Sequence, residues 1–110
     1  MNFQIFHFHL YYPVEEIAKA TKVLEKLAQD KEGIPIGRIW DRPVGPHPIG
    51  SCQVTVQKEN FFEMIEWFLN NRQGFSVFIH PDTGNDYADH TDHVLWMGKE
   101  HKLNIEQFKK

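Results

Sequence analysis

Alternating apolar and polar positions predict four strands, and helical spacing of apolar positions predicts two helices. In the first predicted strand, residues 3–12, Phe6, Phe8 and Leu10 point to one face while His7 and His9 point to the other. The same alternation predicts strands over residues 36–41, 51–57 and 75–80. Apolar residues three and four apart predict one helix from Val14 to about Gln29, and a second between Asn60 and Gly74.

The order strand, helix, strand, strand, helix, strand predicts an α+β fold of the ferredoxin-like βαββαβ type. We expect one domain over residues 1–110, with a four-stranded antiparallel sheet and both helices on one face. The first strand should lie between the third and fourth, parallel to the third and antiparallel to the fourth. The other face carries several histidines, and it should be covered by a second copy of the chain in a homodimer or by the C-terminal residues.

Composition excludes several classes of protein. The chain has 110 residues, which suits a single domain. Its single cysteine, Cys52, excludes an intramolecular disulfide and a cysteine-rich zinc site. A net charge of -3 without a basic stripe argues against binding to nucleic acid. No apolar run reaches the roughly 18 residues of a membrane span, and no signal peptide is visible, so we expect a cytoplasmic protein with no membrane partner.

Histidine is the unusual component, with seven residues. In the predicted topology His80, His47 and the pair His7 and His9 approach one mouth of the sheet from three stretches of chain. Each histidine alone is at least as typical of an ordinary polar position as of a metal ligand, but their convergence favours a divalent transition metal. The remaining ligand is either another histidine or a carboxylate from the acidic loop, for which the candidates are Asp82, Asp86, Asp89 and Asp92.

Several motifs resemble the DOPA 4,5-dioxygenase family of small ring-cleaving enzymes. They lie in residues 8–12, 37–50, 80–85, 89–90 and 96–98. The resemblance implies a dimeric ferredoxin-like enzyme that holds non-haem Fe(II) and opens a catechol, such as DOPA, by extradiol cleavage with O₂. It also implies metal ligands, which are His9, His47 and His80. His7 and His90 are then candidates for acid–base catalysis or for a remaining ligand, and zinc or another divalent metal competes for such a site.

The resemblance also suggests how a small aromatic substrate is held. Arg38 is placed to pair with an acidic substituent, and Trp40 and Tyr11 to stack on the ring, although dimer packing explains the two aromatic residues equally well. Two other functions stay open. One is a metal-binding or small-ligand-binding ferredoxin-like module without catalysis. The other is a cofactor-free α+β barrel enzyme in which a histidine performs acid–base chemistry.

Overall fold

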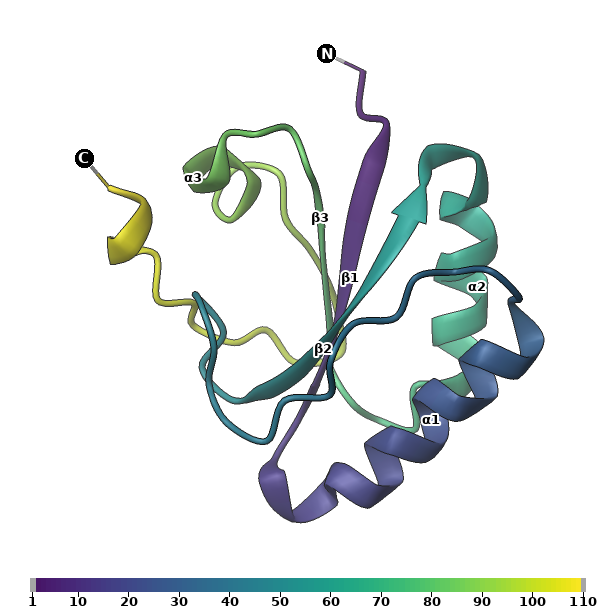
Figure 1. Ribbon diagram of the computed structural model, residues 1–110. Coiled ribbons are helices and arrows are strands. Elements are labelled where there is room, and N and C mark those ends of the chain that lie inside the picture. The colour runs from purple at the N-terminus through teal and green to yellow at the C-terminus, as the bar shows by residue number, and fades with distance from the viewer. Residues whose placement is uncertain (1, 110) are drawn as a thin grey trace.

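The computed structural model describes residues 2–109, which form a four-stranded antiparallel sheet in the order β2-β1-β3-β4 (Figure 1). The strands are β1 (Ile5–Tyr12), β2 (Gly50–Gln57), β3 (Val77–Pro81) and β4 (Leu95–Met97). The predicted fold class, an α+β fold consistent with the ferredoxin-like arrangement, is confirmed.

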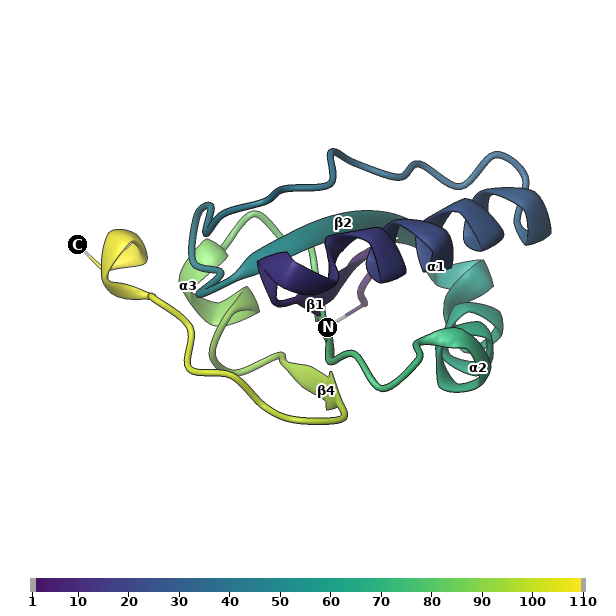
Figure 2. The same ribbon diagram turned by 90° about the horizontal axis from the view of Figure 1, so that it is seen from below.

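Helices lie on both sides of this sheet, but they are of very different size. The two long helices, α1 (Ile17–Asp30) and α2 (Phe61–Asn71), lie on one side, as predicted, while the short α3 (Asp86–Asp89) lies on the other side with the C-terminal segment (Figures 1 and 2). Within the described residues there are also short 3-10 helices at Val14–Glu16, Lys58–Asn60 and Glu106–Phe108.

The two faces of the sheet separate as the alternation predicts. Phe8, Leu10 and Tyr12 of β1 belong to the apolar core beneath the long helices. The core also contains Cys52, Val54 and Val56 of β2 and Val77 and Ile79 of β3. Because successive strand residues point to opposite faces, His7 and His9 are placed on the side away from those helices.

One predicted strand is nearly absent and another forms where none was expected. Residues 36–41 contribute only an isolated bridge, between Ile36 and Val54, although Gly37 N–H and Trp40 N–H still donate to carbonyls of β2. Pro35 has no N–H to donate, and Gly37 has no side chain to pack, so a regular ladder does not form there. The short apolar run before Gly98 instead forms β4, the edge strand beside β3.

The predicted parallel pairing of the first and third predicted strands is wrong. The third predicted strand is β2, and it runs antiparallel to β1, with Ile5 opposite Gln57 and Tyr12 opposite Gly50. In a split βαβ unit, one strand is inserted between two strands that are parallel to each other. The inserted strand is antiparallel to both, so every pair of adjacent strands is antiparallel. The loop that precedes β2 therefore arrives at the Tyr12 end of β1, not at the end where β1 begins.

Gly50 lies where this loop joins the sheet and leaves no room for a side chain. A Cβ atom at this position would lie 2.8 Å from the Trp40 carbonyl oxygen and 2.9 Å from Cε1 of Tyr12. We expect Gly50→Ala to lower the free energy of unfolding by about 1–3 kcal/mol in urea denaturation, because backbone and a buried ring would have to shift. Gln53→Ala, at an exposed position of the same strand, is the control; equal stability of the two variants would contradict the close packing.

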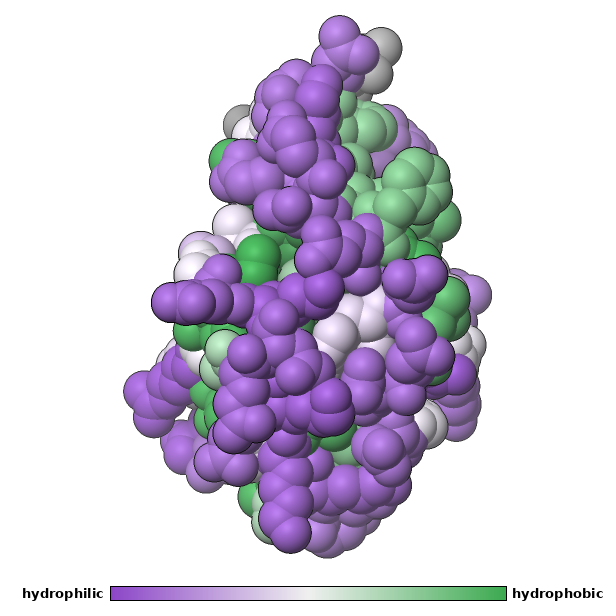
Figure 3. All heavy atoms as spheres, turned by 90° about the vertical axis from the view of Figure 1, so that its right-hand side faces the viewer, coloured by the Kyte–Doolittle hydropathy of each residue, from purple (hydrophilic) through white to green (hydrophobic). Residues whose placement is uncertain are grey.

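The side of the molecule that carries the long helices is mostly hydrophilic, with separate hydrophobic patches (Figure 3). Phe62 and Leu69 of α2 are among its exposed apolar side chains, at 85% and 61% exposure. None of the helices within residues 2–109 has the length and apolar character needed to cross a membrane.

Candidate metal centre

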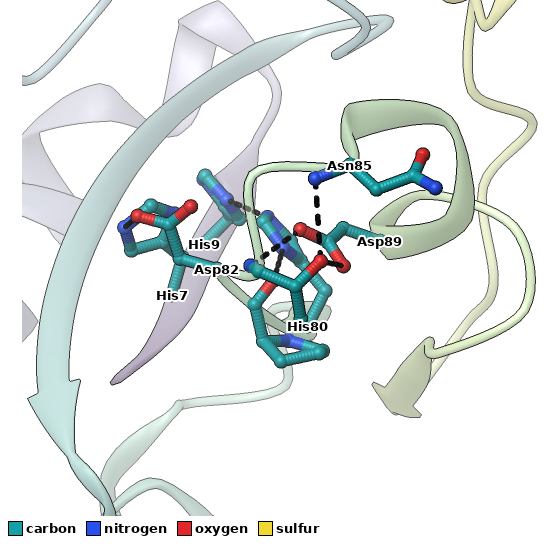
Figure 4. A network of polar contacts seen from close by, with 8 residues as sticks. His7, His9, His80, Asp82, Asn85 and Asp89 are labelled. Atoms are coloured by element: carbon teal, nitrogen blue, oxygen red, sulfur yellow. Dashed lines mark hydrogen bonds and ion pairs between the residues drawn. The ribbon is translucent and has the colours of Figure 1, made fainter. Parts of the chain in front are cut away.

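Three histidines from two adjacent strands converge on one point of the sheet. His7 and His9 belong to β1, and His80, in β3, lies directly opposite His7 in the ladder. One ring nitrogen from each of the three lies within 4.8 Å of the others, and Nε2 of His9 is 3.0 Å from Nε2 of His80. Figure 4 shows these side chains gathered beside the loop that follows β3.

Two more histidines flank this group from outside the sheet. The His47 ring centroid is 4.3 Å from that of His9, and the His90 ring centroid is 4.3 Å from that of His80. His47 ends a turn in which its N–H donates to the carbonyl of Val44. The proline-rich loop therefore folds back over the open face of the sheet, which brings His47 to His9 despite the antiparallel direction of β2.

Backbone carbonyls fix the tautomers of two of these rings. Nδ1 of His80 lies 2.7 Å from the carbonyl oxygen of Pro81, and Nδ1 of His90 lies 2.7 Å from that of Asp86. A carbonyl oxygen only accepts, so Nδ1 must carry the hydrogen in both rings. In the neutral rings Nε2 then has a free lone pair, which is the arrangement found in metal-binding histidines.

Burial keeps the clustered histidines neutral. The pKa values of His80 and His47 are both lowered to about 4. Burial is the main cause, and the nearby His90 makes a smaller contribution in the same direction. Burial and neighbouring histidines hold the pKa of His9 well below its usual value. The pKa of His7 is lowered less, since the charge of Asp82 partly offsets its burial. Neutral imidazole is the form that binds metals.

The spacing of the donors also fits a transition metal. Two nitrogens bound at right angles to one ion, each about 2.1 Å away, are about 3 Å apart. The observed 3.0 Å between His9 and His80 matches that separation. Neutral imidazole nitrogens suit iron, zinc, copper or nickel better than magnesium or calcium.

The acidic loop does not place a carboxylate among these nitrogens. Asp82 is the nearest to the group, with Oδ2 3.7 Å from Nε2 of His7. Asp89 is buried, but both of its carboxylate oxygens accept hydrogen bonds from Thr83. Asp86 and Asp92 are exposed. Of the sequence alternatives, the described residues therefore group three histidines together without an acidic member.

An open cavity of about 640 Å³ lies beside His90, between the flank of the histidine cluster and the C-terminal segment. Its lining includes His90 and Trp96, and residues 100–106 of that segment form much of the rest. Asn104 N–H donates to the carbonyl of Pro46, and Phe108 stacks on His90, which holds the segment over this face. The chain thus supplies the C-terminal cover that was one of the two expectations for the open face.

Comparison with known proteins identifies the group to which this chain is related. Residues 6–107 match the sequence profile of the Dopa 4,5-dioxygenase family. The chain belongs to this family. A DOPA 4,5-dioxygenase of Amanita muscaria is 32% identical over 107 residues, and an uncharacterized 21.2 kDa protein of Botryotinia fuckeliana is 28% identical over 116 residues. These matches cover 90% and 98% of this chain but only 47% and 63% of the two fungal proteins.

A solved structure supports the same conclusion. A protein from Nostoc punctiforme PCC 73102, proposed to be a dioxygenase, has a TM-score of 0.88 and 35% identity. The match covers 96% of this chain and 90% of the other. The family resemblance seen in the sequence is confirmed.

In this Dopa 4,5-dioxygenase family member, one of the residues predicted to hold a substrate lies at the histidine cluster, and the other two pack on each other. Tyr11 is buried at the cluster, where its hydroxyl lies 2.6 Å from Nδ1 of His47. Arg38 stacks on Trp40, with its guanidinium carbon 4.3 Å from the ring centre, and neither is among the described residues that line the cavity. Their role in substrate binding stays a prediction.

Two cavity residues were missed in the sequence. Trp96, in β4, stacks on Phe78 and meets Tyr11 edge to face. His101 stacks on Trp96, and its Nε2 lies 3.2 Å from the hydroxyl of Ser76. The apolar run around Trp96 was visible, but nothing in its pattern indicated that it forms an edge strand facing the histidines. The sequence around His101 is typical of an exposed residue in a C-terminal tail.

Proposed function

We propose that this chain is a non-haem Fe(II)-dependent extradiol dioxygenase that cleaves a DOPA-like catechol with O₂. The observation that carries the proposal is the group of three neutral histidines, with ligand atoms within 4.8 Å of one another. The adjoining cavity and the family membership support it. The three-nitrogen group makes a bound metal more reasonable than a cofactor-free mechanism.

We assign the metal ligands to His7, His9 and His80. This changes the assignment implied by the family resemblance, in which His47 took the place of His7. The change follows from geometry, because His47 is outside the three-nitrogen group and its Nδ1 contacts the Tyr11 hydroxyl. His47 and His90 then flank the metal ligands, where acid–base chemistry would be their role.

The protein groups around this site suit proton transfer from a catechol. When bound, Fe(II) would supply Lewis acidity toward the catechol oxygens and a path by which electrons of the catechol reach O₂. His90 lines the cavity, and with Nδ1 donating to Asp86 its neutral ring offers Nε2 as a base for a catechol hydroxyl proton. His47 is held by Tyr11 on the His9 side of the cluster, where it would serve as a second proton carrier.

Trp96 should provide the surface on which an aromatic substrate packs. We expect Trp96→Leu to raise the KM for a catechol by about 10-fold, since it removes an aromatic contact of about 1 kcal/mol or more. Trp40→Leu is the matched control, because Trp40 packs under Arg38 and is not among the described residues that line the cavity. Steady-state kinetics of both variants check this. A larger increase in KM for Trp40→Leu than for Trp96→Leu would contradict this role of Trp96 and support Trp40 as the substrate contact.

Anaerobic reconstitution tests the proposed reaction. The protein is loaded with Fe(II), mixed with a panel of catechols that includes DOPA and protocatechuate, and then exposed to O₂. We expect a yellow ring-opened product only when Fe(II) is present. Turnover that persists after chelation would favour a cofactor-free enzyme, and tight metal binding without turnover of any catechol would favour a binding module.

A further inference from the structure

Asp89 is the only carboxylate among the buried residues in the described part of the chain, with 1% exposure. It makes two hydrogen bonds to one residue. Thr83 N–H donates to Oδ2 at 2.8 Å, and the Thr83 hydroxyl donates to Oδ1 at 2.7 Å. Both oxygens of this carboxylate are thus directed at the loop that follows β3, as Figure 4 shows.

These two bonds close a loop whose ends both reach the histidines. Asp82 precedes Thr83, and its carboxylate lies 3.7 Å from Nε2 of His7. His90 follows Asp89, and its ring packs 4.3 Å from that of His80. Asp82 N–H is itself anchored to β1 through the carbonyl of Ile5. The Asp89–Thr83 contact therefore joins two segments of the loop. One carries Asp82, which contacts His7, and the other carries His90, which packs beside His80.

We propose that Asp89 is a positioning residue, which places His90 and Asp82 against the histidine cluster by holding Thr83. It acts through these neighbours and does not itself contact a reactant. The proposal rests on the proposed function only in that the cluster is taken to bind a metal. Groups that orient a metal-binding histidine commonly change metal affinity by about 10-fold to 100-fold when removed.

Asp89→Ala separates this role from that of a simple surface charge. Alanine has no side-chain acceptor, so both bonds from Thr83 are lost, whereas an asparagine amide could still accept from the Thr83 N–H and donate to the Thr83 hydroxyl. Asp92→Ala is the matched control, since it removes the same charge three residues away at an exposed position. If Asp89→Ala does not fold, Thr83→Val removes one of the two bonds and leaves the carboxylate in place, while Thr83→Ser retains the hydroxyl.

Two measurements on the full chain distinguish positioning from a general effect on stability. The first is the NMR signals of the His90 ring, which the tilted ring of His80 and the stacked ring of Phe108 shift in the native protein. The second is Co²⁺ affinity, obtained by competition with a chelator. Circular dichroism and the signals of core methyl groups verify that each variant is folded.

The expected result is that folded Asp89→Ala, or Thr83→Val in its place, loses the displaced His90 signals and binds Co²⁺ about 10-fold to 100-fold more weakly. Asp92→Ala and Thr83→Ser should match the wild type. Wild-type His90 signals and Co²⁺ affinity in a folded Asp89→Ala or Thr83→Val variant would overturn the proposal, even if stability had fallen. If the wild type binds no Co²⁺, the proposed function fails, while the His90 signals still decide the role of Asp89.

Discussion

Replacing His9 with glutamine is expected to lower metal affinity by about 100-fold to 1,000-fold and to abolish ring cleavage. A complete protein site binds zinc with about 10–16 kcal/mol, so the loss of one ligand among several costs a few kcal/mol. The His9 ring is a neighbour of the His7 ring and of the His47 ring, and its Nε2 is 3.0 Å from that of His80. Isothermal titration or chelator competition with Co²⁺ measures the change.

Two further variants make this result specific. His93→Gln is the control, since His93 packs on Phe3 and is outside the three-nitrogen group. His47→Gln distinguishes the two ligand assignments. Unchanged metal affinity supports His7 as the third ligand, and a loss of metal affinity as large as that of His9→Gln supports His47 as the third ligand instead. Wild-type metal affinity in His9→Gln would contradict both assignments.

The metal-free protein should become much less stable as the pH falls from about 6.5 to about 4. The pKa values of His47 and His80 are about 4 in the folded chain because of burial, against 6.5 for exposed histidine. Between these values the unfolded chain binds protons that the folded chain does not, so acid favours unfolding. Each residue then accounts for about 3 kcal/mol, which is fully present above the unfolded pKa and lost as the pH approaches the folded one.

Urea denaturation of chelator-treated protein across this pH range measures the effect. His47→Gln should flatten the dependence by about 1.4 kcal/mol per pH unit in this window, because one of the depressed groups is gone. A free energy of unfolding that does not change between pH 6.5 and 4.5 would show that these histidines are not buried as neutral rings.

Most of the three-histidine group could be predicted because strand alternation alone determines it. His7 and His9 share a face with His80 once Phe6, Phe8 and Leu10 and their β3 counterparts are assigned to the core. The identity of the third nitrogen could not be predicted in this way. It depends on the register that sets His7 opposite His80, and on the fold of the proline-rich loop that turns His47 toward Tyr11.

Other parts of the site depend on contacts that no local pattern encodes. Much of the cavity lining comes from the C-terminal segment, which packs through Phe108 on His90 and through a backbone hydrogen bond from Asn104 to Pro46. Asp89 gave the same local signal as Asp86 and Asp92, and only the folded loop shows that its carboxylate is buried on Thr83. Because the same chain covers its own open face, the homodimer is no longer needed for that purpose and stays a prediction.

The most direct test of the central claim is the origin of the oxygen atoms in the ring-opened product. The Fe(II)-loaded protein is allowed to react with a catechol under ¹⁸O₂ and analysed at once by mass spectrometry, before aldehyde oxygen exchanges with water. A dioxygenase places both atoms of one O₂ in one product molecule, so we expect a mass increase that corresponds to two ¹⁸O atoms. A product with no ¹⁸O, or with one atom under conditions where exchange is shown to be absent, would contradict the proposed reaction.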